Sequence, residues 1–148
     1  MAQSITLWIY YMLNAYEVKE KDGKYIGYVP DVGLTTVPLD SDQEVEDTLG
    51  EAFFTYVEIV YRRKRKPIPT PVTSTDGKFA LYIPIKFQLK ILLWNTMLEK
   101  HINQTELAQM LGVSRMAVNQ MLNKIGNTSV ERYENTLQIL GKYPKVTL

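Results

Sequence analysis

A guanidinium, a thioether and two carboxamide side chains lie close together in the C-terminal third of the chain: Arg115, Met116, Asn119 and Gln120. Arginine pairs bidentately with guanine, asparagine or glutamine pairs with adenine, and an apolar side chain can contact the methyl group of thymine. If residues 114–124 form a helix, all four lie near its start and on its outer face. This chemistry favours base recognition in the major groove of DNA, with Arg115 and Gln120 as the main readers.

Residues 104–123 predict the two short helices that would present this face. Gly112 suits the turn after the first helix, because glycine adopts a positive φ without strain. Ser114 suits the N-cap of the second helix. Ala108 is small where the helices approach, and the inward positions are apolar: Leu107, Leu111, Val118 and Met121. The pattern is typical of a DNA-binding helix-turn-helix, although two helices of an ordinary all-α core share much of this spacing.

The remaining contacts of this motif are predicted to be with the DNA backbone. Gln104, Ser114 and Lys124 are placed to hold phosphates, and Thr105 belongs to the same predicted DNA-binding set. One such domain binds weakly, so we expect a homodimer or tetramer assembled through the C-terminal domain. Its operator would be double-stranded DNA with an inverted repeat, the half-sites lying about one helical turn apart.

Composition excludes several classes of protein. The chain of 148 residues has no cysteine and one histidine, His101, so disulfides and thiolate metal sites are excluded and a histidine cluster is disfavoured. We therefore expect no metal, no cofactor and no catalytic residues. No apolar run approaches the roughly twenty residues that span a bilayer. These features favour a cytoplasmic protein that does not enter a membrane.

Charge is unevenly distributed along the chain. Residues 1–85 carry 9 Lys+Arg and 12 Asp+Glu, a net charge of −3, whereas residues 86–148 carry 8 and 4, a net charge of +4. The basic part suits a phosphate backbone, and the acidic part suits a basic partner. The basic run at residues 62–66 is predicted to be the solvated end of a helix, and a direct role with nucleic acid is the less favoured interpretation.

The pattern along the chain predicts an α+β fold with two domains. The N-terminal domain, residues 1–83, is predicted to contain strands 5–18, 25–29, 34–37 and 79–83. A helix from Ser41 to Arg65 with a Ser41/Glu44 capping box follows the third strand, and a proline-rich connection, residues 66–72, precedes the fourth. The C-terminal domain, residues 84–148, is predicted to be all-α, with a buried helix at 85–102 and capping boxes at Asn103/Glu106 and Thr128/Glu131 before later helices.

This order of elements resembles HicB-type antitoxins of bacterial toxin–antitoxin pairs. The resemblance rests on Tyr-Val-Pro-Asp-Val-Gly at residues 28–33, Ile-Pro-Thr-Pro at 68–71, the apolar helix after residue 83 and the helix-turn-helix. It implies a β-β-β-α-β, partial RNase H-like domain that binds and neutralises a HicA-like toxin, an mRNA-cleaving ribonuclease. It also implies a C-terminal domain that represses its own operon. Tyr28, Asp31 and Thr35 are the residues that the resemblance suggests for the toxin contact.

Enzymatic activity is not expected from this chain. An RNase H-type site needs several carboxylates converging on Mg²⁺, whereas the acidic residues here cluster at a loop and at a helix start, where the helix dipole explains them. Two other functions stay open. One is a stand-alone repressor that senses a small ligand in a pocket between the sheet and helix 41–65. The other is an interaction module whose helix-turn-helix packs only against protein.

Overall fold

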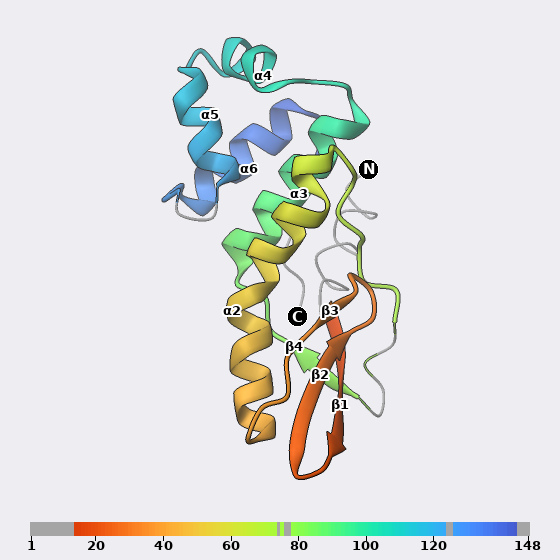
Figure 1. The fold of residues 1–148 in the computed structure, drawn as a ribbon. Helices are drawn as coiled ribbons and strands as arrows, with labels where there is room; N and C mark the ends of the chain where they lie inside the picture. The colour runs from red at the N-terminus through yellow and green to blue at the C-terminus, as the bar shows by residue number, and fades with distance from the viewer. Residues whose placement is uncertain (1–13, 74, 76–77, 124–125, 145–148) are drawn as a thin grey trace.

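The computed structural model describes residues 14–73, 75, 78–123 and 126–144. At one end a four-stranded sheet lies against helix α2 (Asp42–Val60), and at the other end four helices pack together (Figure 1). The predicted α+β class, with a β-β-β-α-β region followed by helices, is confirmed. The first predicted strand, residues 5–18, falls among the described residues only from residue 14 onward, where the chain is strand.

The sheet has the order β3-β2-β1-β4, and every neighbouring pair is antiparallel. Its strands are β1 (Asn14–Lys21), β2 (Lys24–Val29), β3 (Leu34–Thr35) and β4 (Phe79–Leu81). The predicted hairpin turn is confirmed, since Asp22 and Gly23 both have positive φ, 53° and 74°. The last two strands are shorter than the predicted 34–37 and 79–83. Beyond β3 the backbone bonding to β2 continues irregularly, since Thr36 donates to the carbonyl of Gly27 and Leu39 forms an isolated bridge with Tyr25.

Helix α2 covers one face of this sheet. The hydroxyl oxygen of Ser41 accepts from the backbone N–H of Glu44 at 3.2 Å, which confirms the predicted cap. The carboxylate of Glu44 accepts from Asp40 and not from Ser41, so the reciprocal half of the capping box is displaced by one residue. Gly27 is required where the layers meet, because a Cβ there would lie 2.3 Å from Cγ1 of Val45. The main helix residues in this core are Val45, Leu49, Phe53, Phe54 and Val57.

The helical end contains α3 (Ile85–Glu99), α4 (Gln104–Leu111), α5 (Arg115–Leu122) and α6 (Val130–Ile139). Helix α3 is apolar on several sides because it borders both cores. Ile91 belongs to the core beneath the sheet, whereas Leu89 and Leu93 belong to the core among the helices. The helical core consists of Leu89, Leu92, Leu93, Met97, Leu107, Ala108, Val118, Met121, Leu122, Tyr133, Leu137 and Leu140.

Three helix boundaries differ from the predicted ones. The helix predicted from Ser41 to Arg65 ends at Val60, and a short 3-10 helix, η1 (Arg62–Lys64), follows it. The predicted Thr128/Glu131 box is wrong, because the hydroxyl of Ser129 caps α6 by accepting from the N–H of Arg132 at 3.1 Å. Thr128 is buried and its hydroxyl hydrogen-bonds the side chain of Tyr133. The helix predicted over 85–102 ends at Glu99, since His101 adopts a left-handed backbone with φ 55° and Ile102 donates back to Met97.

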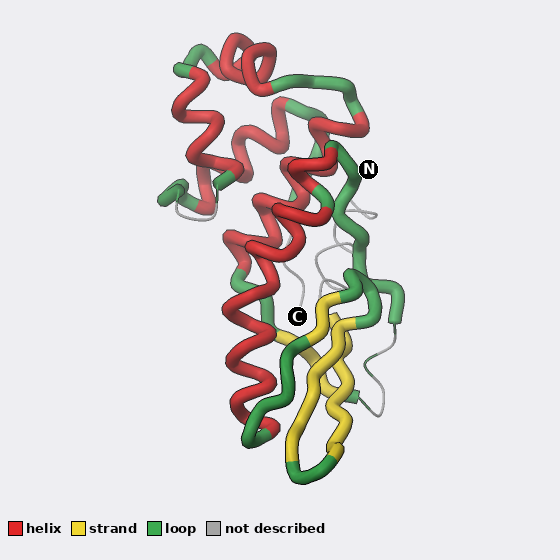
Figure 2. Tube along the Cα trace, in the orientation of Figure 1, coloured by secondary structure: helices red, strands yellow, loops and turns green. Residues whose placement is uncertain are grey.

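The proline-rich connection is extended, as predicted, and it is fixed against α3. Figure 2 shows it as a loop that runs from the end of α2 back toward the sheet. The amide of Asn95 pairs with both backbone groups of Ile68, accepting from its N–H at 2.8 Å and donating to its carbonyl at 2.9 Å. The indole N–H of Trp94 donates to the carbonyl of Lys66 at 3.3 Å. These bonds fix the segment after α2 to the helical end.

Candidate nucleic-acid interface

The turn between α4 and α5 has the geometry that the sequence predicts. Gly112 has φ 65° and ψ 34°, and Val113 donates its N–H to the carbonyl of Ala108 at 3.0 Å. The hydroxyl of Ser114 accepts from the N–H of Ala117 at 3.1 Å. Asn103 and Glu106 form a complete capping box before α4. The starts of both helices are therefore fixed by local hydrogen bonds.

Helix α5 presents the predicted polar face to solvent. Met116 is 71% exposed, and Arg115, Asn119 and Gln120 are also exposed. Of the inward positions, Leu107, Val118 and Met121 are fully buried, whereas Leu111 is half-buried. On α4, Thr105 is exposed and Gln104 is half-buried. Lys124, which the sequence places among the phosphate contacts, lies outside the described residues.

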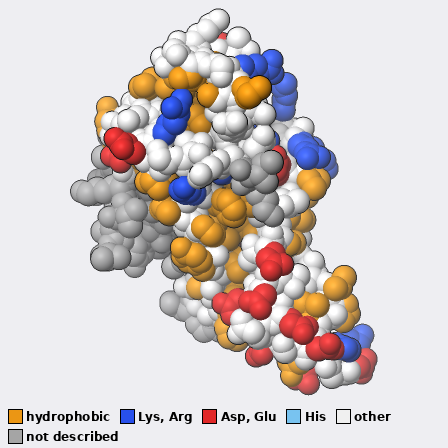
Figure 3. Space-filling model, turned by 90° about the vertical axis from the view of Figure 1, so that its left-hand side faces the viewer, with side chains coloured by type: hydrophobic (Ala, Val, Ile, Leu, Met, Phe, Trp, Pro, Cys, Tyr) orange, Lys and Arg blue, Asp and Glu red, His pale blue; other side chains and the backbone are white. Residues whose placement is uncertain are grey.

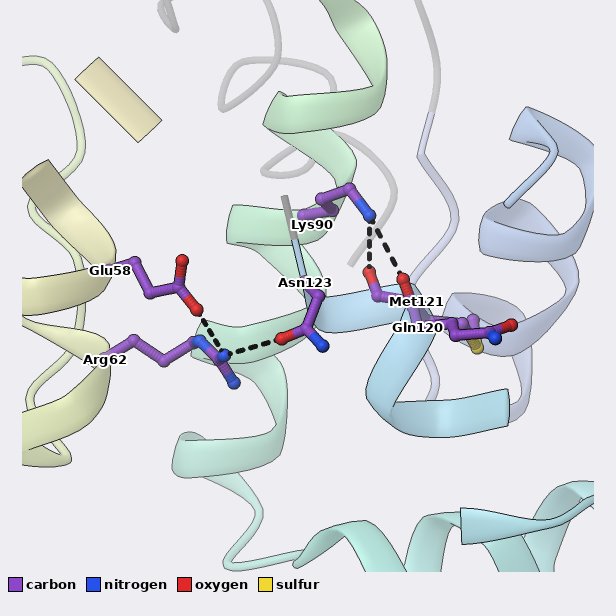
Figure 4. A network of polar contacts seen from close by, with 6 residues as sticks. All are labelled: Glu58, Arg62, Lys90, Gln120, Met121 and Asn123. Atoms are coloured by element: carbon purple, nitrogen blue, oxygen red, sulfur yellow. Dashed lines mark hydrogen bonds and ion pairs between the residues drawn. The ribbon is translucent and has the colours of Figure 1, made fainter. Parts of the chain in front are cut away.

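The C-terminal end of α5 is held by a lysine that the sequence analysis did not single out. Lys90 of α3 is buried, and its ammonium group donates to the carbonyls of Gln120 (3.3 Å) and Met121 (3.1 Å) (Figure 4). It also donates to the carbonyl of Gly126 at 3.3 Å. It also lies over the ring of Tyr133. A cation is favourable at a helix C-terminus. The signal in the sequence was a lysine between Leu89 and Ile91, in the most apolar stretch of the helix.

Burial shifts the pKa values of both Lys90 and Tyr133. Burial lowers the pKa of Lys90 to about 8, with smaller lowering from the nearby cations Lys86 and Arg62. Burial also raises the pKa of Tyr133 to about 12, against a smaller opposing effect of its hydrogen bond with Thr128. The phenol of Tyr133 donates to the carbonyl of Met121 at 2.7 Å, so it too fixes the end of α5.

Arg62 joins the end of α2 to the end of α5. Its guanidinium donates to the carboxylate of Glu58 at 2.6 Å and to the amide oxygen of Asn123 at 3.1 Å (Figure 4). It also lies over the ring of Trp94, 5.8 Å from the centroid. The prediction that the basic run is wholly a solvated helix end is therefore wrong for Arg62. Arg63, Lys64, Arg65 and Lys66 are exposed.

The three residues suggested for a toxin contact lie at the sheet. Tyr28 and Thr35 are direct partners across β2 and β3, and both are exposed. Because Gly27 and Val29 face α2, these two side chains point to the opposite face of the sheet. Asp31 is occupied within the chain, since its carboxylate accepts from the hydroxyl of Thr73 at 2.7 Å and from its N–H at 3.2 Å.

Charge follows the long axis of the molecule. Figure 3 shows most of the visible acidic side chains gathered at the end that carries the hairpin and the start of α2. The exposed acids of this end include Asp40, Asp42, Glu44, Glu46 and Asp47. The described residues contain no group of three or more His, Cys, Asp and Glu side chains able to hold a metal ion. Among the same residues, no helix has the length and apolar character needed to cross a bilayer.

The fold and this interface define a helix-turn-helix protein with an additional α+β region. A family model described as Helix-turn-helix matches residues 96–145. The chain is 34% identical to Antitoxin HicB 2 of Photorhabdus laumondii over 98 residues, 66% of either chain. It is 30% identical to Antitoxin HicB of Pseudomonas fluorescens over 135 residues, covering 86% of this chain and 88% of that one. It is 28% identical to Antitoxin HicB of Escherichia coli K12 over 100 residues, 68% and 69% of the two chains.

The chain belongs to the HicB antitoxin family and carries a C-terminal helix-turn-helix. The resemblance stated from the sequence is thereby confirmed. Membership of an antitoxin family makes the chain a regulatory protein and not an enzyme.

Proposed function

We propose that this chain neutralises a HicA-like, mRNA-cleaving toxin through its N-terminal region and represses its own operon through α4 and α5. One observation carries the proposal: within a chain of the HicB antitoxin family, α5 exposes Arg115, Met116, Asn119 and Gln120 on one face while its other face is buried. Arg115 and Gln120 are the proposed base readers. Gln104, Thr105, Ser114 and Lys124 are the proposed backbone contacts.

The proposed operator is an inverted repeat bound by a homodimer or tetramer. Two copies of α5 related by a two-fold axis would enter successive major grooves, with half-sites about one helical turn apart. Substituting Arg115→Ala should weaken binding by roughly 1–3 kcal/mol and relax preference at one base pair. The matched control is Lys21→Ala, which removes one charge from the hairpin at the opposite end of the molecule.

The measurement is an anisotropy titration with a duplex from the DNA upstream of the coding sequence and with a shuffled duplex. Arg115→Ala should lose affinity mainly for the upstream duplex, and Lys21→Ala should bind as the wild type does. Equal binding of both duplexes by the Arg115→Ala chain and the wild type would show that α5 does not read the sequence.

We propose two domains with different partners, residues 1–83 for the toxin and residues 84–148 for DNA. The strand order and the β-β-β-α-β succession support a partial RNase H-like fold for the first. The antiparallel pairing of β4 with β1 departs from the parallel pair that a direct strand–helix–strand crossover makes. Ile91 of α3 packs into the core formed by the sheet and α2. The proposed boundary at residue 83 therefore divides the two proposed binding functions, but it does not divide the two hydrophobic cores cleanly.

The proposed toxin surface is the open face of the sheet at Tyr28 and Thr35, with the acidic end of the molecule beside it. A ribonuclease that grips RNA is expected to be basic, so these acids would speed its association. Tyr28→Lys with Thr35→Lys should abolish rescue of cells that express the neighbouring small basic toxin. Asp31→Asn should affect rescue less, because its carboxylate holds Thr73. Full rescue by the double lysine variant would place the toxin elsewhere.

A small-ligand sensor is not favoured by these observations. Its predicted pocket lies between the sheet and α2, but the α2 residues that face the sheet there, Val45, Leu49 and Val57, are fully buried and belong to the core.

A further inference from the structure

The basic run that follows α2 lies in the same groove as the helix-turn-helix. This groove has a volume of about 650 Å³ and is built from the ends of four helices. Its polar lining includes Arg63 and Arg65 after α2, His101 after α3, Gln104 and Thr105 at the start of α4, and Arg115 at the start of α5. Residues some fifty positions apart in the sequence thus share one concave surface with the proposed DNA contacts.

The charges in this groove are available to an external anion. Arg62 also lines the groove but is used within the fold by Glu58, Asn123 and Trp94. Among the ion pairs of the described residues, Arg63, Arg65 and Arg115 have no acidic partner. Among the described residues that line the groove, the acidic one is Glu106, and its carboxylate accepts from the N–H of Asn103 in the capping box.

Arg63 and Arg65 belong to a turn whose backbone is fixed by hydrogen bonds. Arg65 has a left-handed backbone with φ 54°, and its N–H donates to the carbonyl of Arg62 at 3.0 Å. The N–H of the next residue, Lys66, donates to the carbonyl of Tyr61 at 3.0 Å. The bond from Trp94 to Lys66 ties this turn to α3. The backbone of a turn fixed in this way has little conformational entropy left to lose when a partner binds, so the cost of ordering is confined to the arginine side chains.

We infer that Arg63 and Arg65 contact phosphates of the same DNA duplex that α5 reads. This inference rests on the proposed DNA binding and adds a backbone contact from outside the helix-turn-helix. DNA is the partner that fits best, because the groove is continuous with Arg115 and three unpaired guanidinium groups match a polyanion. The proposed toxin fits poorly here, because a basic ribonuclease would be repelled by the same charges.

The test uses the full chain with two matched double variants. Arg63→Gln/Arg65→Gln removes two charges that line the groove. Lys64→Gln/Lys66→Gln removes two exposed charges from the same segment whose side chains do not line it. Each protein is titrated with the upstream duplex, the shuffled duplex and a single-stranded RNA over a range of salt concentrations. Thermal unfolding of each variant confirms that the fold is retained.

We expect the arginine variant to bind both duplexes roughly tenfold more weakly near physiological salt. The salt slope, which is the steepness with which the logarithm of the binding constant falls as the logarithm of the salt concentration rises, should decrease by about two for each bound chain. The lysine variant should change much less. Equal losses in the two variants would assign the effect to net charge and overturn the contact. An unchanged arginine variant, or one that loses only RNA binding, would overturn it as well.

Failure of this inference can be told apart from failure of the proposed function. If wild-type protein does not prefer the upstream duplex, base reading by α5 fails, yet the salt slopes on the shuffled duplex still report on Arg63 and Arg65. If wild-type protein prefers the upstream duplex and the arginine variant keeps the wild-type affinity and slope, only the groove contact fails.

Discussion

The sheet end and the helical end of the molecule differ in what positions their exposed side chains. On α5, a cap at Ser114 and a glycine turn at Gly112 fix the orientation of the outer face within about twenty residues. On the sheet, Tyr28 is set beside Thr35 and Glu17 by strand pairing. A binding face built from one local motif can therefore be predicted from the sequence. A face built from separate strands can be predicted only when the register in which the strands pair is known.

The sheet end and the helical end share helix α3, and this shared helix determines whether the two ends can unfold independently. Ile91 and Leu93 are two residues apart on α3 and lie in different cores. Damage to the sheet core should therefore reach the helix-turn-helix through α3.

The largest expected effect comes from emptying the core beneath the sheet. Phe53 is 2% exposed, and Phe53→Ala should lower the free energy of unfolding by about 3–5 kcal/mol. Because α3 completes both cores, we expect a single urea transition, with circular dichroism and tryptophan fluorescence changing together. Loss of the fluorescence signal at a different urea concentration from the helical signal would show that the two ends unfold as separate units.

The second prediction concerns pH and is confined to the helical end. The pKa of Lys90 is lowered to about 8 from 10.5, so below pH 8 the cost of burying its charge is fully present. Between pH 8 and 10.5 the unfolded chain binds more protons than the folded chain, and the free energy of unfolding should rise by up to about 3 kcal/mol. Tyr133 acts in the opposite direction from pH 10 to about 12, because its folded pKa is raised.

Urea unfolding across this pH range checks the prediction, with Lys90→Met as the comparison. The variant keeps the apolar stem and loses the titrating group, so the rise between pH 8 and 10 should be absent. A variant that shows the same rise as the wild type would mean that other groups produce it. Phe53→Ala is the matched control from the sheet end, and it should keep the wild-type rise.

Features set by residues close in the sequence are mostly predictable, whereas contacts between distant residues are not. The caps at Asn103 and Ser114 follow from spacings of three residues. The bonds from Lys90 to Gln120 and from Arg62 to Asn123 span 30 and 61 positions, and no periodicity reports them. Thr128 and Ser129 are adjacent hydroxyls that could each begin α6, and the burial of Thr128 against Tyr133 decides between them.

The third prediction concerns the hydrogen bond from Arg62 to Asn123, which joins the end of α2 to the end of α5. Arg62→Met should lower the free energy of unfolding by about 2 kcal/mol, because Glu58, whose side chain is 15% exposed, loses its partner and Asn123 loses a charged donor. Arg63→Met, an exposed neighbour, should change it by less than about 0.5 kcal/mol. A double-mutant cycle with Asn123→Ala isolates the contact between the ends, and zero coupling would show that this contact adds no stability.

The smallest expected effect separates two roles of Ser114, which caps α5 and is proposed to hold a phosphate. Ser114→Ala should lower the free energy of unfolding by about 1 kcal/mol, whereas Ser114→Gly should cost only a few tenths, since glycine is tolerated at an N-cap. Both variants remove the hydroxyl, so a phosphate contact predicts equal losses in affinity for DNA. If affinity instead follows stability, with Ser114→Gly binding like the wild type, Ser114 acts only by capping α5 and the backbone contact must be reassigned.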